Sequence, residues 1–184
     1  MFNRISVLLF IAVLAVLPIA RAQVTATYYS MDFGENFPHA FVHLTGTRDD
    51  GTPVNKYLGF SARTVTPAIL VSAVSGEVIR RTPRYIDVSE PRFALVLTDE
   101  QFEAINSVAD YWEDNKLSYD LNQRNCIHFV ADTLHVIGLT VNWESEFFKK
   151  PKGFLREVGR LNVGYVIDLE DAPASYANTA HGLD

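Results

Sequence analysis

The sequence predicts an α+β fold in which strands occupy the first half of the chain and helices the second half. Short β-branched and aromatic stretches dominate as far as residue 97, and two amphipathic helical patterns follow. The length of 184 residues suits a single domain, since domains commonly contain about 100–200 residues. With 48% hydrophobic residues, the chain has enough apolar side chains for a buried core, which excludes a wholly disordered protein.

The strand-rich half begins with a hairpin pattern. Residues 37–44 are rich in apolar and aromatic side chains, and residues 56–61 can pair back onto them across the polar segment 47–53. That segment contains an Asp-Gly dipeptide, which is typical of tight hairpin turns. Residues 93–97 (FALVL) are apolar throughout, which predicts a strand buried on both faces. Further short strands are expected at residues 68–74, 78–79 and 85–88.

Two helices are expected after the strands. Thr98 and Gln101 have the spacing of a capping box, which predicts that the first helix begins there. The second helix is expected to start near Asn125 and to end at Gly138, because glycine is common just beyond a helix C-terminus. The apolar residues of both helices recur at three- and four-residue steps, as expected for buried faces. They are Phe102, Ile105, Ala109, Trp112, Phe129, Val130, Leu134 and Ile137.

The last part of the chain has weaker patterns. Residues 146–160 mix basic and aromatic side chains and predict a short helix after Pro151. Residues 165–167 are the last strand candidate. Small and polar residues dominate from residue 170 to residue 184, so we expect a disordered tail there and a folded domain over residues 23–169.

Residues 1–22 have the pattern of a secretory signal peptide. Arg4 precedes an apolar run over residues 5–17, and Ala20 and Ala22 supply the small residues that signal peptidase requires. This run is shorter than the about 20 residues of a membrane-spanning helix, and an uncleaved anchor is the alternative. We therefore expect a periplasmic or secreted protein with no transmembrane segment after cleavage.

The composition argues against several classes of protein. The formal net charge is −6, from 16 Lys and Arg against 22 Asp and Glu, so a nucleic-acid partner is not expected. A single cysteine excludes an internal disulfide framework and a cysteine-rich zinc module. His39, His43, Cys126 and His128 are zinc-ligand types, but their spacing does not converge on one point, so neither a metal nor another cofactor is expected.

Cys126 is the candidate nucleophile. It stands at the predicted start of a helix, where unsatisfied N–H groups and the helix dipole favour a thiolate. A buried structural cysteine is the alternative. At about 100° per residue, His128 and His135 are rotated away from the cysteine on the same helix. His39 and His43 point to one side of their strand, because strand side chains alternate, and either is a candidate base.

Two short motifs resemble those of a known superfamily. Residues 119–121 (YDL), followed by residues 125–130 (NCIHFV), resemble the Y-x-L…N-C-x-H-F motif of circularly permuted papain-like cysteine hydrolases. These include lecithin–retinol acyltransferase-like proteins and PPPDE-type peptidases, relatives of NlpC-type cell-wall peptidases. Residues 39–46 (HAFVHLTG) resemble the H-V-G-I-x-L-G strand, which precedes the cysteine helix in the permuted branch. The resemblance implies an antiparallel sheet packed against helices, with the cysteine at a helix N-terminus.

The resemblance also implies a role for each matched residue. Cys126 would be the nucleophile and His39 the general base, with His43 as the alternative base. The third residue, which orients the histidine, would come from the next strand, where Asn55 and Ser61 are the candidates.

The upstream part of the cysteine motif would complete the site. Tyr119 and Asn125 would line the cleft or help to hold an oxyanion, together with the backbone N–H of Cys126. Phe41 stands where the family usually has glycine, which would narrow the cleft near the histidine.

These expectations describe an exported thiol-dependent hydrolase or acyltransferase that acts on an amide or ester carbonyl. A cell-wall (peptidoglycan) peptide amide is the nearest substrate, and a lipid-acyl substrate would use the same residues. One alternative is a catalytically inactive papain-like binding or envelope-structure module. Another is a toxin-like amidase in which residues 146–160 contact a partner or a membrane surface.

Overall fold

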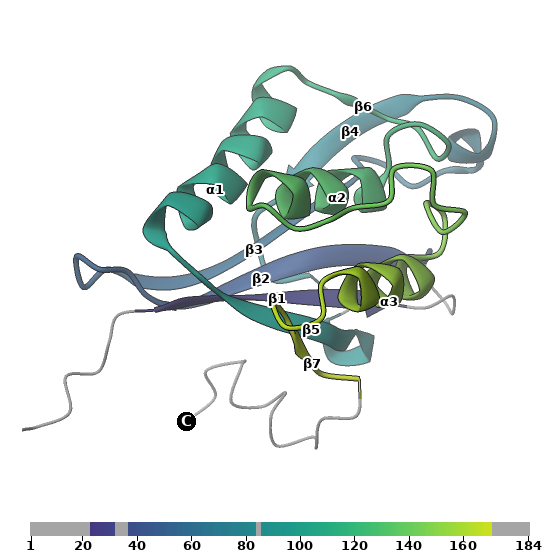
Figure 1. Ribbon diagram of the computed structural model, residues 1–184. Helices are drawn as coiled ribbons and strands as arrows, with labels where there is room; N and C mark the ends of the chain where they lie inside the picture. The colour runs from purple at the N-terminus through teal and green to yellow at the C-terminus, as the bar shows by residue number, and fades with distance from the viewer. Residues whose placement is uncertain (1–22, 32–36, 84–85, 171–184) are drawn as a thin grey trace, which may run out of the picture.

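The computed structural model describes residues 23–31, 37–83 and 86–170, which form a seven-stranded antiparallel sheet and three α-helices (Figure 1). The α+β class is therefore confirmed. The predicted signal peptide and residues 171–184 of the predicted tail lie outside the described residues. In sheet order the strands are β6 (Ser118–Tyr119), β4 (Val74–Ile79), β3 (Pro53–Ala62), β2 (His39–Thr47), β1 (Val24–Met31), β5 (Glu90–Leu97) and β7 (Ile167–Asp168).

β1 is an interior strand of the sheet, between β2 and β5. Its register with β2 pairs Met31 with His39. Its register with β5 shifts after Tyr28, and Arg92 is the extra residue of this bulge. A bulge re-aims the side chains around it, which gives Arg92 an irregular position at the end of the β1–β5 ladder.

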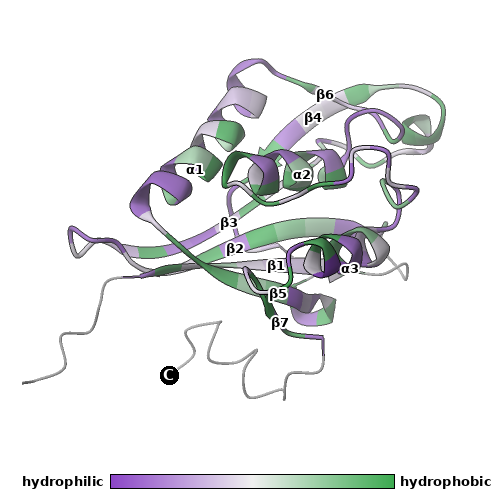
Figure 2. Cartoon of the chain, viewed as in Figure 1, coloured by the Kyte–Doolittle hydropathy of each residue, from purple (hydrophilic) through white to green (hydrophobic). Residues whose placement is uncertain are grey.

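Three helices pack against this sheet. α1 (Asp99–Asp114) begins with the predicted capping box: Thr98 accepts a hydrogen bond from the Gln101 N–H, and the Gln101 side chain accepts one from the Thr98 N–H. Figure 2 shows hydrophobic and hydrophilic residues alternating along α1, as expected for a helix with one buried side. α2 (Cys126–Val136) and α3 (Pro151–Leu161) follow.

The main hydrophobic core lies between the sheet and the helices. Ala40 and Val42 of β2 point into it, as does Phe60 of β3. Trp112 of α1 packs edge-on against Phe60, with ring centroids 4.6 Å apart. Because neighbouring strand residues alternate, the residues between these positions point to the other face of the sheet. A smaller cluster lies on that face and consists of Tyr29, Phe41, Tyr57 and the partly buried Ile86.

Several expected strands differ in the structure. A short 3-10 helix at Pro67–Leu70 overlaps the expected strand 68–74, and another at Ile86–Val88 lies within the expected strand 85–88. Pro67 explains the first difference, because its fixed φ and missing N–H suit the first turn of a helix. The last strand of the described residues is Ile167–Asp168 rather than residues 165–167, and β1 is not among the expected strands although it is rich in Val, Thr and Tyr.

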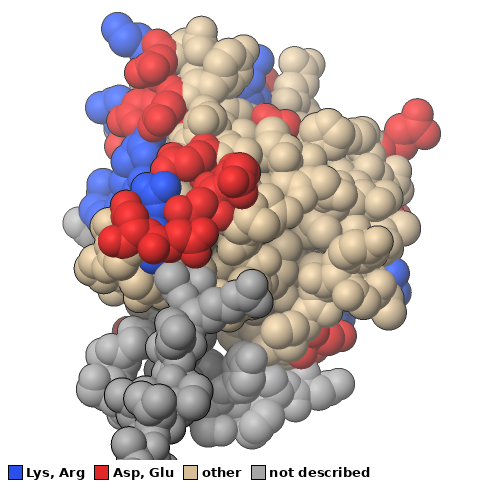
Figure 3. Space-filling view, turned by 60° about the vertical axis from the view of Figure 1, so that its left-hand side comes forward, with Lys and Arg blue, Asp and Glu red and all other residues tan. Residues whose placement is uncertain are grey.

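Charged side chains gather around α1. Arg48 pairs with Asp99 and Glu103, and Arg80 pairs with two further acidic residues of the same helix. Figure 3 shows basic and acidic side chains interleaved on one side of the molecule, while much of the rest of this face is uncharged. Such exposed pairs contribute little to stability, and their mixed signs leave no basic surface here for phosphates.

Candidate functional site

Cys126 is the first residue of α2, and its side chain lies in the main core at 3% exposure. Asn125 caps the helix: its Oδ1 accepts hydrogen bonds from the N–H groups of Ile127 (2.8 Å) and His128 (3.3 Å). The cap fixes the direction in which α2 starts and therefore the place of the thiol against β2.

Burial raises the pKa of the Cys126 thiol to about 11. Backbone N–H groups of Ala40, Cys126 and Ile127 act in the opposite direction but do not outweigh the loss of solvation. The helix start therefore does not produce the thiolate that its dipole alone would favour. The thiol is therefore protonated at neutral pH.

His39 lies on the sheet face opposite to Cys126. A Cβ atom built on Gly59 would lie 3.2 Å from the Phe41 Cβ and 3.4 Å from the His39 Nε2, so both side chains are on one face. Ala40, the residue between them, points to the other face and belongs to the same core cluster as Cys126. The predicted pair of Cys126 and His39 is therefore not formed, because a strand with a period of two separates these side chains.

The pKa of His39 is also unfavourable for the predicted role. Burial lowers this pKa to about 4, so the imidazole is neutral at neutral pH and a weak base. A general base works best with a pKa near the operating pH.

His43, the alternative base, lies on the same face as His39. Its Nε2 is 2.8 Å from the Asn55 Oδ1, and its ring stacks on Tyr57 with centroids 3.9 Å apart. The structure thus brings two predicted site residues, His43 and Asn55, together. They meet on the far side of the sheet from Cys126, so Asn55 does not orient a base for this thiol.

Ser61, the other candidate for the third residue, lies two positions after Gly59 on β3. It shares the sheet face of Gly59 and is paired in register with Glu77 of β4. Its hydroxyl is therefore on the histidine face and not on the side of the sheet that holds Cys126.

Asn125 and Tyr119, the expected oxyanion or cleft residues, are both buried. The Asn125 Nδ2 donates hydrogen bonds to the carbonyl oxygens of Leu121 (2.9 Å) and Phe148 (2.7 Å), which uses both of its N–H groups. The predicted oxyanion role of Asn125 therefore has no donor left. Tyr119 is close enough to Cys126 to influence its electrostatics, and burial raises the pKa of the Tyr119 hydroxyl.

His128 helps to fix the start of α2. Its Nδ1 accepts a hydrogen bond from the Asn125 N–H (3.3 Å), and its ring stacks on Phe148 with centroids 4.5 Å apart. The histidine of the N-C-x-H-F motif is thus occupied by a capping interaction.

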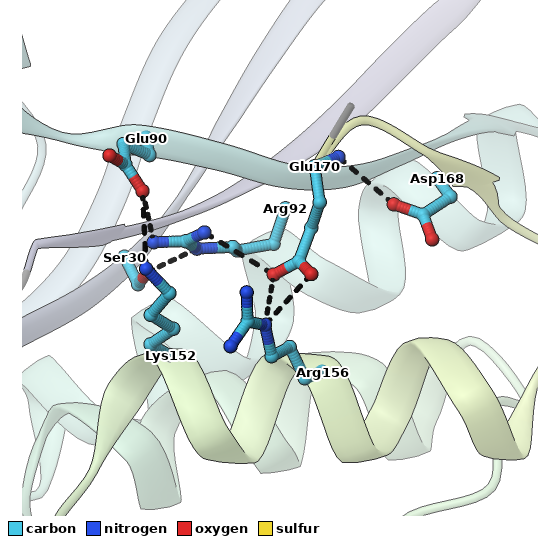
Figure 4. A network of polar contacts seen from close by, with 7 residues as sticks. All are labelled: Ser30, Glu90, Arg92, Lys152, Arg156, Asp168 and Glu170. Atoms are coloured by element: carbon cyan, nitrogen blue, oxygen red, sulfur yellow. Dashed lines mark hydrogen bonds and ion pairs between the residues drawn. The ribbon is translucent and has the colours of Figure 1, made fainter. Parts of the chain in front are cut away.

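A cleft beside β7, at the edge of the sheet, is a second candidate site. The sequence patterns do not predict it. Its volume is about 520 Å³, within the range of small-molecule sites. Five charged residues line it: Arg92, Arg156, Arg160, Asp168 and Glu170. Figure 4 shows four of them in one network of polar contacts with Ser30, Glu90 and Lys152. The one sequence feature that points to this cleft is an arginine directly before the apolar run 93–97.

Neither a metal cluster nor a spanning helix occurs in the described parts of the chain. Within residues 23–31, 37–83 and 86–170, no three His, Cys, Asp or Glu side chains group so that they could hold a metal ion. Over these same residues, no helix combines the length and apolar character needed to cross a bilayer.

Comparison with models of protein families, with curated proteins and with solved structures gives no match in any of the three.

Proposed function

We propose that this chain is an exported binding or envelope-structure module that does not use thiol catalysis. The observation that supports this proposal most is that Cys126 and the two strand histidines lie on opposite faces of the sheet. A catalytic thiol needs a base within about 2.6–3.2 Å, or one water molecule away. Rotation of a side chain does not carry an imidazole through a hydrogen-bonded sheet.

Proton affinities support the same conclusion. In this arrangement burial raises the pKa of the Cys126 thiol to about 11 and lowers that of His39 to about 4, so the proton stays on sulfur. An activated cysteine has the reverse order, with a thiol pKa below its usual value.

The residues of the N-C-x-H-F motif have structural uses that account for their presence. Asn125 caps α2, His128 contacts this cap and stacks on Phe148, and Phe129 is fully buried. A motif that builds the start of a buried helix can persist without catalysis, because each residue contributes to the stability of the helix.

A thiol-dependent hydrolase or acyltransferase of exported papain-like type is the second candidate. One observation favours it: the Cys126 thiol lies near three backbone N–H groups and near Tyr119, as an oxyanion site would require. This candidate requires a rearrangement of the start of β2 that moves His39 to the other face. Its substrate would be a cell-wall peptide amide or a lipid acyl group.

The rate of iodoacetamide labelling of Cys126 between pH 6 and pH 9 separates the two candidates. We expect the folded wild-type chain to label far more slowly than the same chain in urea at every pH, because its thiol is buried and protonated. His39→Ala and His43→Ala form a matched pair, and neither should change the pH dependence. Fast labelling below pH 7 that is lost only in His39→Ala would overturn the proposal and establish a Cys126–His39 dyad.

A further inference from the structure

The cleft beside β7 is built around a buried arginine. Arg92 is 4% exposed, and its guanidinium is fixed by three acceptors. Its Nε donates to the Ser30 Oγ (2.6 Å), its Nη2 to Glu90 (2.5 Å) and its Nη1 to Glu170 (3.3 Å), as Figure 4 shows. A buried charge with this many fixed partners forms a rigid positive wall at the base of the cleft.

A carboxylate already lies between two guanidinium groups in this cleft. The Nε of Arg156 donates to both oxygens of Glu170, at 2.6 and 2.8 Å, and Arg92 contacts the same carboxylate from the other side. The Glu170 N–H donates to the Asp168 Oδ1 (2.9 Å), which holds this part of the backbone in place. This is the geometry of a carboxylate-recognition site, and the carboxylate that it holds in this structure is the side chain of Glu170.

Among the residues that the structure describes, the charges around the cleft do not cancel. Four basic and three acidic described side chains line the cleft or join its network, an excess of one positive charge. They are Arg92, Lys152, Arg156 and Arg160, against Glu90, Asp168 and Glu170. The whole chain has a net charge of −6, so this excess is local and opposite in sign to the rest of the protein. A monoanion in the cleft would neutralise it.

The remaining walls of the cleft are apolar. Phe93 and Leu155 are buried side chains of β5 and α3, and Val163 and Val166 come from the segment that leads to β7. Val163 is 79% exposed, so the apolar lining continues to the mouth of the cleft. Basic groups beside an apolar wall favour a ligand that carries both a negative charge and a hydrocarbon part.

We propose that this cleft binds a small carboxylate with an apolar body, held by Arg156 and Arg160 and packed against the accessible side chains of Val163 and Val166. Glu170 competes with the ligand for Arg156. This proposal names the class of ligand that the binding module takes, and it therefore rests on the proposed binding function. The outcome of a binding experiment at the cleft is nevertheless independent of the iodoacetamide labelling of Cys126, because none of the contacts given above joins a cleft residue to Cys126.

Isothermal titration calorimetry of the purified full-length chain at low ionic strength tests the proposal. The probes are octanoate and N-acetylleucine, each compared with its neutral amide. Octanoate represents a free acyl chain and N-acetylleucine the carboxyl end of a peptide. We expect at least one carboxylate to bind, and to bind at least about tenfold more tightly than its amide, because charge-assisted hydrogen bonds to arginine are lost in the amide. Binding by neither carboxylate, or equal binding of acid and amide, overturns the proposal.

Two variants that break the same ion pair have opposite expected effects. Arg156→Gln and Glu170→Gln both remove the ion pair between these residues. Arg156→Gln and Arg160→Gln should weaken carboxylate binding about tenfold, whereas Glu170→Gln should strengthen it by removing the internal competitor. If Glu170→Gln weakens binding as Arg156→Gln does, the ion pair is only a structural clasp and the proposal is wrong.

Arg81→Gln is the matched control for charge. It removes one positive charge from a side chain that is 73% exposed and follows β4, on the other side of the sheet centre from β7. Carboxylate binding should be unchanged in this variant. A weakening equal to that of Arg160→Gln would mean that binding follows net charge and not the cleft, which would overturn the proposal.

Discussion

Replacement of Asn125 with alanine should be far more destabilising than the loss of an ordinary helix cap. The change removes the acceptor for the Ile127 and His128 N–H groups, and loss of such a cap costs about 1 kcal/mol. It also removes the donors to the carbonyl oxygens of Leu121 and Phe148, and each buried group left without a partner costs about 1–3 kcal/mol. At the lower end of each range the free energy of unfolding falls by about 3 kcal/mol.

Urea denaturation, followed by circular dichroism, measures this loss. Thr98→Ala is the matched control, because Thr98 caps α1 from an exposed position and should cost only about 1 kcal/mol. Asn125→Asp retains the acceptor but places a buried carboxylate oxygen against the two carbonyl oxygens, so its cost should be at least that of the two carbonyl groups alone. If Asn125→Ala costs no more than Thr98→Ala, the reasoning that Asn125 ties together three segments of the fold is refuted.

Three further predictions concern stability and are measured by the same denaturation. Gly76→Ala should lower the free energy of unfolding by more than about 2 kcal/mol, because the new Cβ would lie 2.3 Å from the Phe60 Cζ. The control Gly51→Ala places its Cβ in open space, so it should cost only the strain of a φ of +85°. Equal costs of the two variants would refute this prediction. Cys126→Ala should cost less than Cys126→Ser, because only serine buries a hydroxyl, and the reverse order would indicate a polar site around the thiol. Since burial lowers the pKa of His39 from 6.5 to about 4, the unfolded chain binds its proton more readily, so stability is fully present above pH 6.5 and falls by about 3 kcal/mol as the pH drops to 4. His39→Gln should lack this part of the pH dependence, and an unchanged dependence would contradict the burial argument.

Local sequence patterns predict much of the secondary structure, because caps and breakers act over a few residues. Thr98 and Gln101 form the capping box that their spacing predicts, and α3 begins at Pro151. β1 is not among the expected strands, although its Val, Thr and Tyr residues favour a strand. It pairs with β2, the next strand in sequence, and also with the distant β5, a partner that no local pattern reveals.

The geometry of the site was harder to predict than its elements. The alternation of His39, Phe41 and His43 on one side of β2 follows from the sequence, but which side the cysteine helix covers does not. Both sides of the strand are buried, so hydrophobicity provides no contrast between them. The cleft beside β7 was missed for another reason, because it joins Arg92 to residues 155–170 and no local pattern links these segments.

The interior position of β1, between β2 and the distant β5, has a consequence for the order in which the chain can fold. Its pairing with β5 joins Val24 to Leu97 and Ser30 to Glu90, so both partners of the first strand are present only when residue 97 has been synthesised. Before that, β1 to β4 can pair only as consecutive antiparallel neighbours. The distant pairing of β1 with β5 is slower to form, because a long loop must close before any contact stabilises it. We therefore expect the emerging chain to pair its first four strands early and to add β5 to the other side of β1 in a later step.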